Sequence, residues 1–193
     1  MKAIAILTVR NEQRFITQCI THLHAQGIET IVVDNQSTDD TVALAWRTAH
    51  LGLKYVLTLP FHNSFNLVEI LANVERLSYD IDADWFMHVD ADEFHEPIDR
   101  NGRLIDVIKK ADSDGYNAIN FIEYAFFPTS ENPNHDHAYF QDTMNWYYAY
   151  CPSQYRRVNA WKKQAKIDLV SGAGHCVNFD GLKIYPANQV MRH

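Results

Sequence analysis

The sequence contains little glycine and lacks the glycine-rich loops that cradle phosphate groups. It has seven glycines among 193 residues, and neither a Gly-x-x-x-x-Gly-Lys nor a Gly-x-Gly-x-x-Gly pattern occurs. P-loop and dinucleotide-binding enzymes hold phosphates through the backbone of such loops. We therefore expect any phosphate that this protein binds to be held through carboxylates and a cation.

Cysteines and long apolar runs are also scarce. The three cysteines, Cys19, Cys151 and Cys176, form no Cys-x-x-Cys pair, which favours reduced thiols and a cytoplasmic protein. No apolar run approaches the roughly 20 residues that span a bilayer, so we expect no transmembrane segment. The apolar start of the chain resembles a signal peptide only superficially, because Arg10-Asn11-Glu12 ends it and no small-residue cleavage site follows.

Basic residues are also fewer than acidic residues. The formal net charge is -7 and the sequence pI is about 5.7. Proteins that bind nucleic acid need a basic patch, so no nucleic-acid partner is expected. Hydrophobic residues make up 47% of the chain, which is enough for a substantial core, and the length fits a single domain over residues 1–193.

Short apolar runs alternate with segments of helical periodicity. Strands are expected at 2–9, 31–33, 54–59, 85–89 and 118–124, and helices at 13–27, 41–50, 67–77 and 104–108. Asp39 or Asp40 is expected to cap the second helix, and Asn63 or Ser64 the third. Strands and helices that alternate with short connections predict an α/β fold with a mostly parallel central sheet flanked by helices.

The expected strand 85–89 ends in three clustered carboxylates, Asp90, Asp92 and Glu93. Open α/β sheets bind ligands at the carboxyl ends of their strands. Two carboxylates separated by one residue suit a hard divalent cation that also holds substrate phosphates. The structural alternative is a solvated acidic turn. Asp34 follows the strand 31–33 in the same way, so we expect it at the same edge of the sheet.

Three segments together resemble the family-2-type glycosyltransferases with the GT-A fold. They are Thr8-Val9-Arg10-Asn11-Glu12, Val32-Val33-Asp34-Asn35-Gln36-Ser37-Thr38-Asp39-Asp40-Thr41 and Val89-Asp90-Ala91-Asp92-Glu93. Their order and spacing both fit that family, and Ser171 to His175 and Tyr185-Pro186 extend the likeness more loosely. The resemblance implies a GT-A-like, Rossmann-type fold. It further implies a nucleotide-sugar-binding half at 1–100 and an acceptor-side half at 101–193.

The resemblance also implies roles for single residues. Nucleotide contacts are expected from Thr8, Val9, Arg10, Asn11, Glu12, Asp34 and Asp90. Asp90 and Asp92 are expected to hold Mn²⁺ or Mg²⁺ against the diphosphate of a nucleotide-diphosphate sugar, most simply a UDP-sugar. Enzymes of this kind often supply a late histidine to the metal, and we expect His175 in this role, with His193 as the rival. The acceptor is expected to be a carbohydrate or a lipid-linked molecule.

The catalytic base is the least defined part of the expected site. An inverting transferase needs a carboxylate that takes a proton from the acceptor hydroxyl. Glu123, near the end of a strand, and Asp142, in the polar stretch 128–145, are the candidates. Glu123 is preferred because strand ends hold side chains more rigidly than loops do. The usual base motif of the family is not recognisable in this sequence.

Several features of the second half have both structural and functional interpretations. Aromatic residues at positions 139–161 suit sugar rings, but core packing is the default explanation. The basic run from Arg156 to Lys166 can contact an acidic acceptor or a diphosphate, although a solvated helix face is the expectation. Of the remaining histidines, His88 is expected to pack in a strand, His95 to lie on the surface, and His135 with His137 to lie in a solvated loop.

Two other functions stay open at this point. A nucleotidyltransferase also combines an α/β sheet with metal carboxylates, but it normally carries a glycine-rich loop near its first strand, and Thr8 to Phe15 contains no glycine. A degenerate transferase domain would bind nucleotide or glycan without turnover. The retained Asp34, Asp90 and Asp92 argue against that reading. The missing base motif and the early end at Arg192-His193 argue for it, and the same early end fits a trimmed domain.

Overall fold

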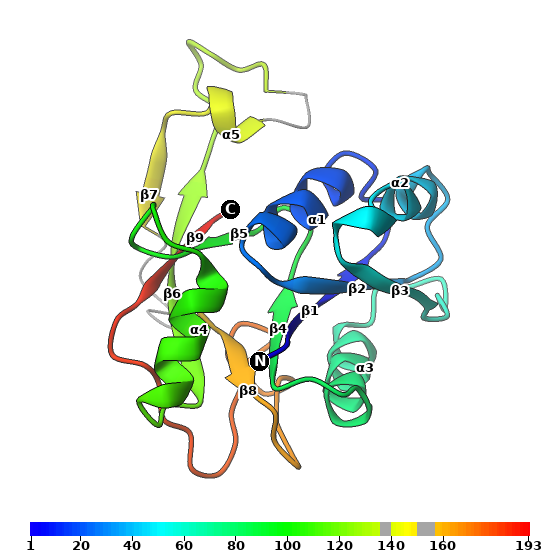
Figure 1. Cartoon of the computed structure of the whole chain (residues 1–193). Helices are drawn as coiled ribbons and strands as arrows, with labels where there is room; N and C mark the ends of the chain where they lie inside the picture. Colours follow the sequence, from blue (N-terminus) through cyan, green and yellow to red (C-terminus); the bar gives the residue numbers. More distant parts are fainter. Residues whose placement is uncertain (136–139, 150–156) are drawn as a thin grey trace.

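The first strand, β1 (Ala3–Val9), lies inside the sheet between two parallel neighbours, β2 (Glu29–Asp34) and β4 (Trp85–Val89). All its residues except Thr8 are buried, as is usual for a strand of a parallel sheet that is covered on both faces. The computed structural model describes residues 1–135, 140–149 and 157–193. The expected α/β architecture is confirmed (Figure 1).

The other strands in these ranges are β3 (Leu53–Thr58), β5 (Phe94–Glu96), β6 (Ala118–Phe126), β7 (Tyr147–Ala149), β8 (Arg157–Lys162) and β9 (Gln189–Arg192). The helices are α1 (Ile16–Ala25), α2 (Thr41–Arg47), the 3-10 helix η1 (Ala49–Leu51), α3 (Leu67–Asp80), α4 (Leu104–Ser113) and α5 (Phe140–Thr143). Within the described ranges, no helix combines the length and the apolar character that crossing a membrane requires.

The N-terminal strands form the parallel part of the sheet, in the order β3-β2-β1-β4. Their register places Val9 opposite Asp34 and Leu7 opposite Val89. The carboxyl ends of β1, β2 and β4 therefore lie at one edge, and the residues that follow them meet there. The expectation that Asp34 and Asp90 share an edge of the sheet is confirmed.

Beyond β4 the sheet continues as β8-β6-β9-β5 with mixed strand directions. β8 is antiparallel to β4 and β6, whereas β9 runs parallel to β6 and pairs with β5 in the antiparallel direction. The β6–β9 register pairs Glu123 with Met191 and Tyr124 with Arg192. Because successive residues of a strand face opposite sides of the sheet, Glu123 and Tyr124 point in opposite directions.

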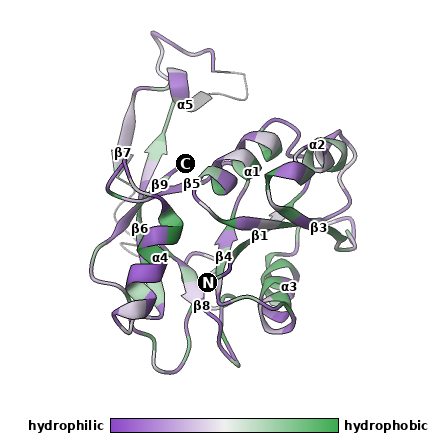
Figure 2. Ribbon diagram, in the orientation of Figure 1, coloured by the Kyte–Doolittle hydropathy of each residue, from purple (hydrophilic) through white to green (hydrophobic). Residues whose placement is uncertain are grey.

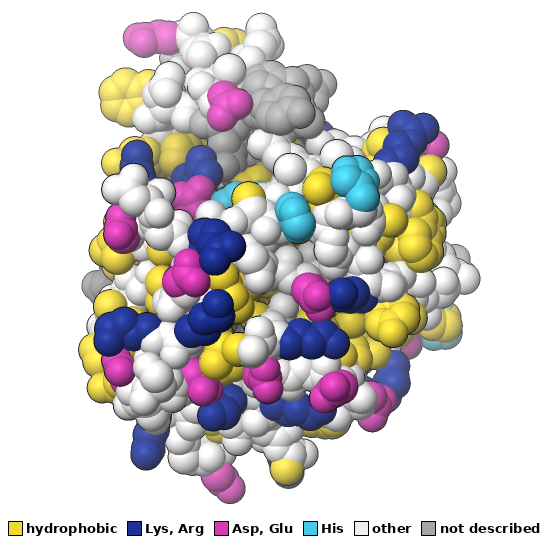
Figure 3. Space-filling model, viewed as in Figure 1, with side chains coloured by type: hydrophobic (Ala, Val, Ile, Leu, Met, Phe, Trp, Pro, Cys, Tyr) yellow, Lys and Arg dark blue, Asp and Glu magenta, His cyan; other side chains and the backbone are white. Residues whose placement is uncertain are grey.

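Two hydrophobic clusters cover the two faces of the sheet. One contains buried residues of α1 and α4, and the other contains buried residues of α3 together with Ile167, Leu169 and Val177. The helices α3 and α4 carry both hydrophobic and hydrophilic residues (Figure 2), and the buried positions of each recur at helical spacing. On the face shown in Figure 3, acidic and basic side chains are interspersed.

The structure corrects the expected cap of α3 and confirms that the start of α2 involves Asp39 and Asp40. Asn66 caps α3, where its side chain accepts a hydrogen bond from the Glu69 N–H at 3.2 Å, so the expectation of Asn63 or Ser64 was wrong. The N-cap position of α2 is Asp40, but its side chain makes no capping bond. The Asp39 carboxylate accepts from the Thr41 N–H at 3.0 Å instead.

Expectations about the basic run and two histidines were also wrong. The residues from Arg157 to Lys162 form β8 rather than a solvated helix, and Arg157 is buried. His95 is fully buried instead of lying on the surface. His135 is buried too, and its ring nitrogens lie 2.9 Å from Thr143 Oγ1 and from the Asn132 carbonyl oxygen. His137, Tyr139, Tyr150, Cys151, Tyr155 and Arg156 lie outside the described residues.

Candidate active site

Hydrogen bonds join the loop after β1 to the loop after β2. The Asn11 N–H donates to Ser37 Oγ at 2.9 Å, and Asn11 Oδ1 accepts from the Thr38 N–H at 2.8 Å. The Glu12 N–H donates to Thr41 Oγ1 at 2.7 Å. Asn11 has a φ of 58°, a left-handed conformation that asparagine tolerates better than most residues. The two loops therefore form one continuous wall at the edge of the sheet.

Asp34 and Arg10 belong to the same wall. Both carboxylate oxygens of Asp34 accept from the Ser37 N–H, at 3.1 and 3.2 Å, and Asp34 is buried at the edge of the sheet. Arg10 donates to the Asn35 carbonyl oxygen at 2.6 Å, and its guanidinium carbon lies 3.5 Å from the centre of the Phe61 ring. Arg10 is therefore held by hydrogen bonding and by a cation–π contact.

The acidic residues after β4 occupy three different environments. Asp90 is exposed, Asp92 is half-buried, and Glu93 is buried. The Glu93 carboxylate accepts from the Asp90 N–H at 3.3 Å, and burial, together with the charge of Asp90, raises the pKa of Glu93 to about 8. Burial and the charges of Asp92 and Asp90 raise the pKa of Glu12 to about 7. Negative charge is thus concentrated where β1 and β4 end, which attracts cations.

His193 lies between two carboxylates. Its Nδ1 lies 2.9 Å from Glu123 Oε1, and its Nε2 lies 3.5 Å from Asp92 Oδ2. Hydrogen bonds with Asp92 and Glu123 raise the pKa of His193 to about 10, so the imidazole is positively charged at neutral pH. Burial opposes ionisation of Asp92, but the contact with His193 prevails and keeps the pKa of Asp92 below its ordinary value.

Glu123 is engaged on both of its oxygens. Arg157 Nε donates to Glu123 Oε2 at 2.6 Å while His193 contacts the other oxygen. Burial opposes ionisation of Glu123, but His193 and Arg157 together keep the pKa of Glu123 below its ordinary value. Arg157 Nη1 also lies 3.9 Å from Glu93 Oε1. A chain of charges therefore runs from Asp92 through His193 and Glu123 to Arg157, and Arg157 also approaches the Glu93 carboxyl group, whose raised pKa keeps it mostly protonated at neutral pH.

Two cavities open around this chain of charges. One has a volume of about 210 Å³, and we name it the His175 cavity. Most of the polar side chains that line it are those of Thr8, His88, Asp90, Arg157, Asn159 and His175. The other, of about 280 Å³, is lined by Arg14, Phe15, Asp92, Ala125, Phe126, Met144 and His193, and we name it the Asp92 cavity. The two cavities divide the acidic pair, because Asp90 lines the first and Asp92 the second.

The loop that carries His175 is packed against β4. Gly174 has a φ of 80°, and a Cβ atom there would lie 3.1 Å from both His88 Cε1 and Leu71 Cδ2. His88 Nδ1 lies 3.2 Å from the Gly174 carbonyl oxygen, which confirms His88 as a packed strand residue. Glycine is therefore needed here because the loop packs closely on His88 and Leu71. Burial, followed by the charge of Arg157, lowers the pKa of His175.

The structure brings some of the expected site residues together and leaves others apart. Thr8, Asp90 and His175 share the His175 cavity, and His193 is the histidine that contacts Asp92. Asp142 is exposed on α5 and lines neither of the two cavities. Met144, two residues further on, does line the Asp92 cavity.

Sequence reasoning missed three residues of the site: Glu93 as a buried carboxylic acid, Arg157 as the partner of Glu123, and Arg14 in the wall of the Asp92 cavity. Glu93 directly follows the acidic pair, and that position was an available signal. Arg157 stands within a basic run, and its burial depends on the partner carboxylate 34 positions earlier in the chain. No local pattern reveals such a pair.

The donor atoms at Asp92 fit a divalent cation only together with a phosphate ligand. Among the described residues, no group of three or more histidine, cysteine or acidic side chains is arranged to hold a metal. Mg²⁺ is commonly held by one or two carboxylates plus substrate phosphates, and Mn²⁺ accepts imidazole as well. Asp92 and His193 together supply the one or two protein ligands that such a phosphate-bound cation needs. His193 must first lose its proton, because only neutral imidazole can bind a metal.

The chain belongs to glycosyl transferase family 2, whose family model matches residues 4–170. A comparison with curated proteins found no match. The resemblance drawn from the sequence is therefore confirmed at the level of the family.

Solved structures with a similar fold include two of TarS from S. aureus. In one of them, 36% of the TarS chain aligns with the whole of this chain, at 14% identity and a TM-score of 0.56. The other, TarS 1-349 in complex with UDP-GlcNAc, matches all of this chain and 58% of its own length, at 13% identity and a TM-score of 0.54. This chain thus spans about a third to somewhat more than half of the TarS chains, and at these identities the likeness concerns the fold alone.

Proposed function

We propose that this protein transfers a sugar from a UDP-linked donor to a carbohydrate or lipid-linked acceptor, with inversion at the anomeric carbon. Membership of family 2 supports sugar transfer. The likeness in fold to TarS, which has been solved with UDP-GlcNAc, supports a UDP-linked donor. The observation that carries the proposal is the meeting of Asp92, His193 and Glu123 beside the joined loops after β1 and β2.

The nucleotide is proposed to lie along the wall formed by these two loops. The residues from Thr8 to Glu12 border it, and Asp34 is held in place by its two hydrogen bonds from the Ser37 N–H. Asp90 is proposed to contact the ribose between base and diphosphate, and its position beside Thr8 in the lining of the His175 cavity supports this. The Asp34 carboxylate is buried and fixed by its hydrogen bonds, so it can accept hydrogen bonds from a nucleotide with little loss of conformational freedom.

The diphosphate is proposed to lie near Asp92 and to share Mn²⁺ or Mg²⁺ with that carboxylate. The cation, when bound, acts as a Lewis acid that neutralises the charge of the leaving diphosphate. Asp92 and His193 would hold it, with Asp90 nearby. His175, which was expected to be a metal ligand, is proposed instead to lie beside the donor, because it lines the same cavity as Asp90.

The proton of the acceptor hydroxyl needs a separate carboxylate. Glu123 was the preferred candidate, but both of its oxygens are engaged by His193 and Arg157. A carboxylate whose pKa is lowered by such contacts is a weak base. We propose that Glu123 positions His193 and that Asp142, two residues from the wall of the Asp92 cavity, takes the proton. The cytoplasmic location and the division at residue 100 stay predictions.

Calorimetric titration with UDP tests the donor and metal parts of the proposal. The wild-type protein should bind UDP in the presence of Mn²⁺ and bind it much more weakly with a chelator. Asp92→Asn keeps the side-chain shape and removes the charge, so this dependence on Mn²⁺ should disappear. Asp180→Asn makes the same change of residue type and is the control, because Asp180 is an exposed acid that lies outside both cavities.

Equal UDP affinity and equal Mn²⁺ dependence in wild type and Asp92→Asn would contradict the proposed metal site. Release of UDP from a UDP-sugar in the presence of Mn²⁺ separates transfer from binding without turnover. The anomeric configuration of the product, read by proton NMR, tests inversion.

A further inference from the structure

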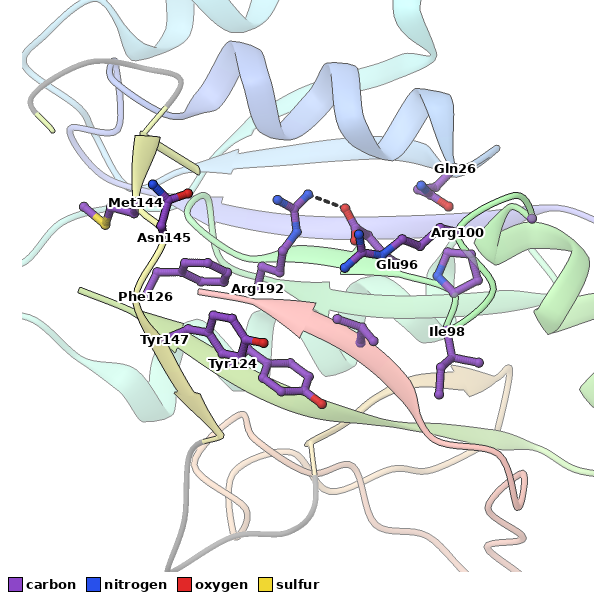
Figure 4. Close-up of a pocket in the computed structure, with 13 residues that line it drawn as sticks. Gln26, Glu96, Ile98, Arg100, Tyr124, Phe126, Met144, Asn145, Tyr147 and Arg192 are labelled. Atoms are coloured by element: carbon purple, nitrogen blue, oxygen red, sulfur yellow. Dashed lines mark hydrogen bonds and ion pairs between the residues drawn. The ribbon is translucent and has the colours of Figure 1, made fainter. Parts of the chain in front are cut away.

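A third cavity lies on the side of β6 and β9 that faces away from Glu123. It has a volume of about 730 Å³, and its walls include Arg100, Tyr124, Phe126, Met144, Tyr147 and Arg192 (Figure 4). We name it the aromatic groove. Tyr124 and Phe126 alternate along β6 with Glu123, so they point to the opposite side of the sheet. The groove is thus separate from the chain of charges around His193.

Three aromatic rings in this groove are held against one another. The ring centres of Tyr124 and Tyr147 are 5.4 Å apart at 83°, and those of Phe126 and Tyr147 are 5.2 Å apart at 40°. Tyr147 nevertheless remains 55% exposed. The groove therefore presents an aromatic ring that is packed on one side and open to a ligand on the other.

The groove also offers cationic hydrogen-bond donors. Arg192 is paired with Glu96, as Figure 4 shows, but its Nε is buried and has no partner within the described chain. Arg100 is exposed, and no ion pair joins it to any residue in the described ranges. One positive charge is therefore uncompensated in a chain whose formal net charge is -7. Guanidinium groups recognise carboxylates and phosphates.

The aromatic groove adjoins the Asp92 cavity. Phe126 and Met144 line both spaces. A ligand with one end at Asp92 can therefore extend over these two side chains into the groove. The volume of the groove falls within the range of roughly 300–1,000 Å³ that is typical of small-ligand sites.

We propose that the aromatic groove holds the part of the acceptor that does not react, and that this part is a sugar chain carrying a phosphate or carboxylate group. The inference rests on the proposed function and adds a class of acceptor to it. Sugar rings present C–H faces that pack on aromatic rings, and their hydroxyls match polar side chains. The polar lining, which includes Gln26, Asn145, Arg100 and Arg192, favours such a ligand over an alkyl chain.

Saturation-transfer NMR with two probes, glucuronic acid and glucose, tests the inference on the whole chain. Wild type should transfer saturation to the ring protons of both, and more strongly to glucuronic acid. Tyr147→Ala should weaken the transfer by about 3- to 10-fold, the loss expected for one aromatic contact. Arg100→Gln should remove the preference for the acidic sugar and keep binding of glucose.

The chain offers matched controls. Tyr55 is 58% exposed, much like Tyr147, and lies on β3, so Tyr55→Ala should leave the transfer unchanged. Arg47, like Arg100, is exposed with no ion pair in the described ranges, and Arg47→Gln controls for the loss of one charge. Each control differs from its test variant in position rather than in residue type.

Three results would overturn the inference: no saturation transfer to either probe in wild type, an equal loss in Tyr147→Ala and Tyr55→Ala, or an unchanged preference in Arg100→Gln. UDP titration of the same samples reports on the donor site separately. Failure of wild type to bind UDP would refute the proposed function, whereas normal UDP binding without sugar binding would refute only the acceptor groove.

Discussion

His193 Nδ1 lies 2.9 Å from Glu123 Oε1, and this contact fixes the ring so that Nε2 faces Asp92. The contact joins the last residue of the described chain to a strand that begins 75 positions earlier, at Ala118. It brings the Glu123 carboxylate of β6 and the Asp92 carboxylate that follows β4 to the same imidazole. The site therefore depends on how β9 sits against β6.

Replacement of His193 should weaken donor binding more than replacement of His175. His193→Ala removes the side chain that contacts Asp92, and loss of such a partner commonly costs about 10- to 100-fold in metal affinity. We expect the dissociation constant of UDP with Mn²⁺ to rise by about tenfold or more in His193→Ala. His175→Ala should have a smaller effect, since His175 lies beside Asp90. Calorimetry of both variants measures this, and a larger loss in His175→Ala would restore our original assignment.

Glu123→Gln and Asp142→Asn should fail in different ways. Glu123→Gln removes a charge that holds His193 and Arg157, so both UDP affinity with Mn²⁺ and the rate should fall. Asp142→Asn should lower the rate of transfer by about 10²- to 10⁴-fold, as expected for a lost base, with UDP affinity unchanged. Steady-state kinetics and UDP titration give the two readouts. Normal UDP affinity in Glu123→Gln together with a lost rate would make Glu123 the base.

His95 should make the fold sensitive to acid. Burial lowers the pKa of His95 to about 3, whereas an unfolded chain binds the proton near pH 6.5. The unfolded state therefore gains protons first as pH falls, and stability is lost below pH 6.5. Between pH 6.5 and about pH 4.5 the loss should reach roughly 2 to 3 kcal/mol from this group. Urea unfolding at several pH values measures it.

His95→Leu should reduce this pH dependence, because the group that resists protonation is gone. His50→Leu serves as the control, since His50 is an exposed histidine in η1. An equally steep loss of stability in wild type and in His95→Leu would show that other groups cause the acid sensitivity.

Gly174→Ala should destabilise the protein more than Gly181→Ala does. The two glycines have similar φ values of 80° and 78°, so the cost of placing alanine in a left-handed conformation is shared. A Cβ at Gly174 would in addition press on His88 and Leu71, whereas the one at Gly181 would meet open space. We expect an extra loss of about 1–3 kcal/mol at Gly174. Thermal unfolding of both variants decides this, and equal losses would mean that the loop adjusts freely.

The N-terminal, parallel part of the fold was predictable because its signals are local. Short apolar runs at 2–9, 31–33 and 85–89 end in polar residues, and strand ends meet at one edge in any parallel sheet. Asp34 and Asp90 could be placed together on this ground alone. Capping was less predictable, because Asn63, Ser64 and Asn66 are all suitable caps and only the start of the helix selects among them.

The C-terminal part of the fold was much less predictable because its contacts are distant in sequence. The burial of Arg157 depends on Glu123 and Glu93, and the position of His193 depends on the register of β9 against β6. From the sequence alone, a basic run is interpreted as a solvated face, because the carboxylates that pair with it are distant in the chain. His95 was misjudged for a similar reason, because the residues that bury it, such as Phe121, come from other strands.

The alternation of side chains along β6 has a consequence for how the gene can change. The Glu123 side chain lies on one side of the sheet and the Tyr124 side chain on the other. A shift of the strand by one residue would move each side chain to the opposite side. A single insertion or deletion within Ala118–Phe126 would thus damage the donor site and the aromatic groove at once, although the two are separate spaces. We expect relatives that keep both to vary in the length of their loops and to preserve the length of this strand.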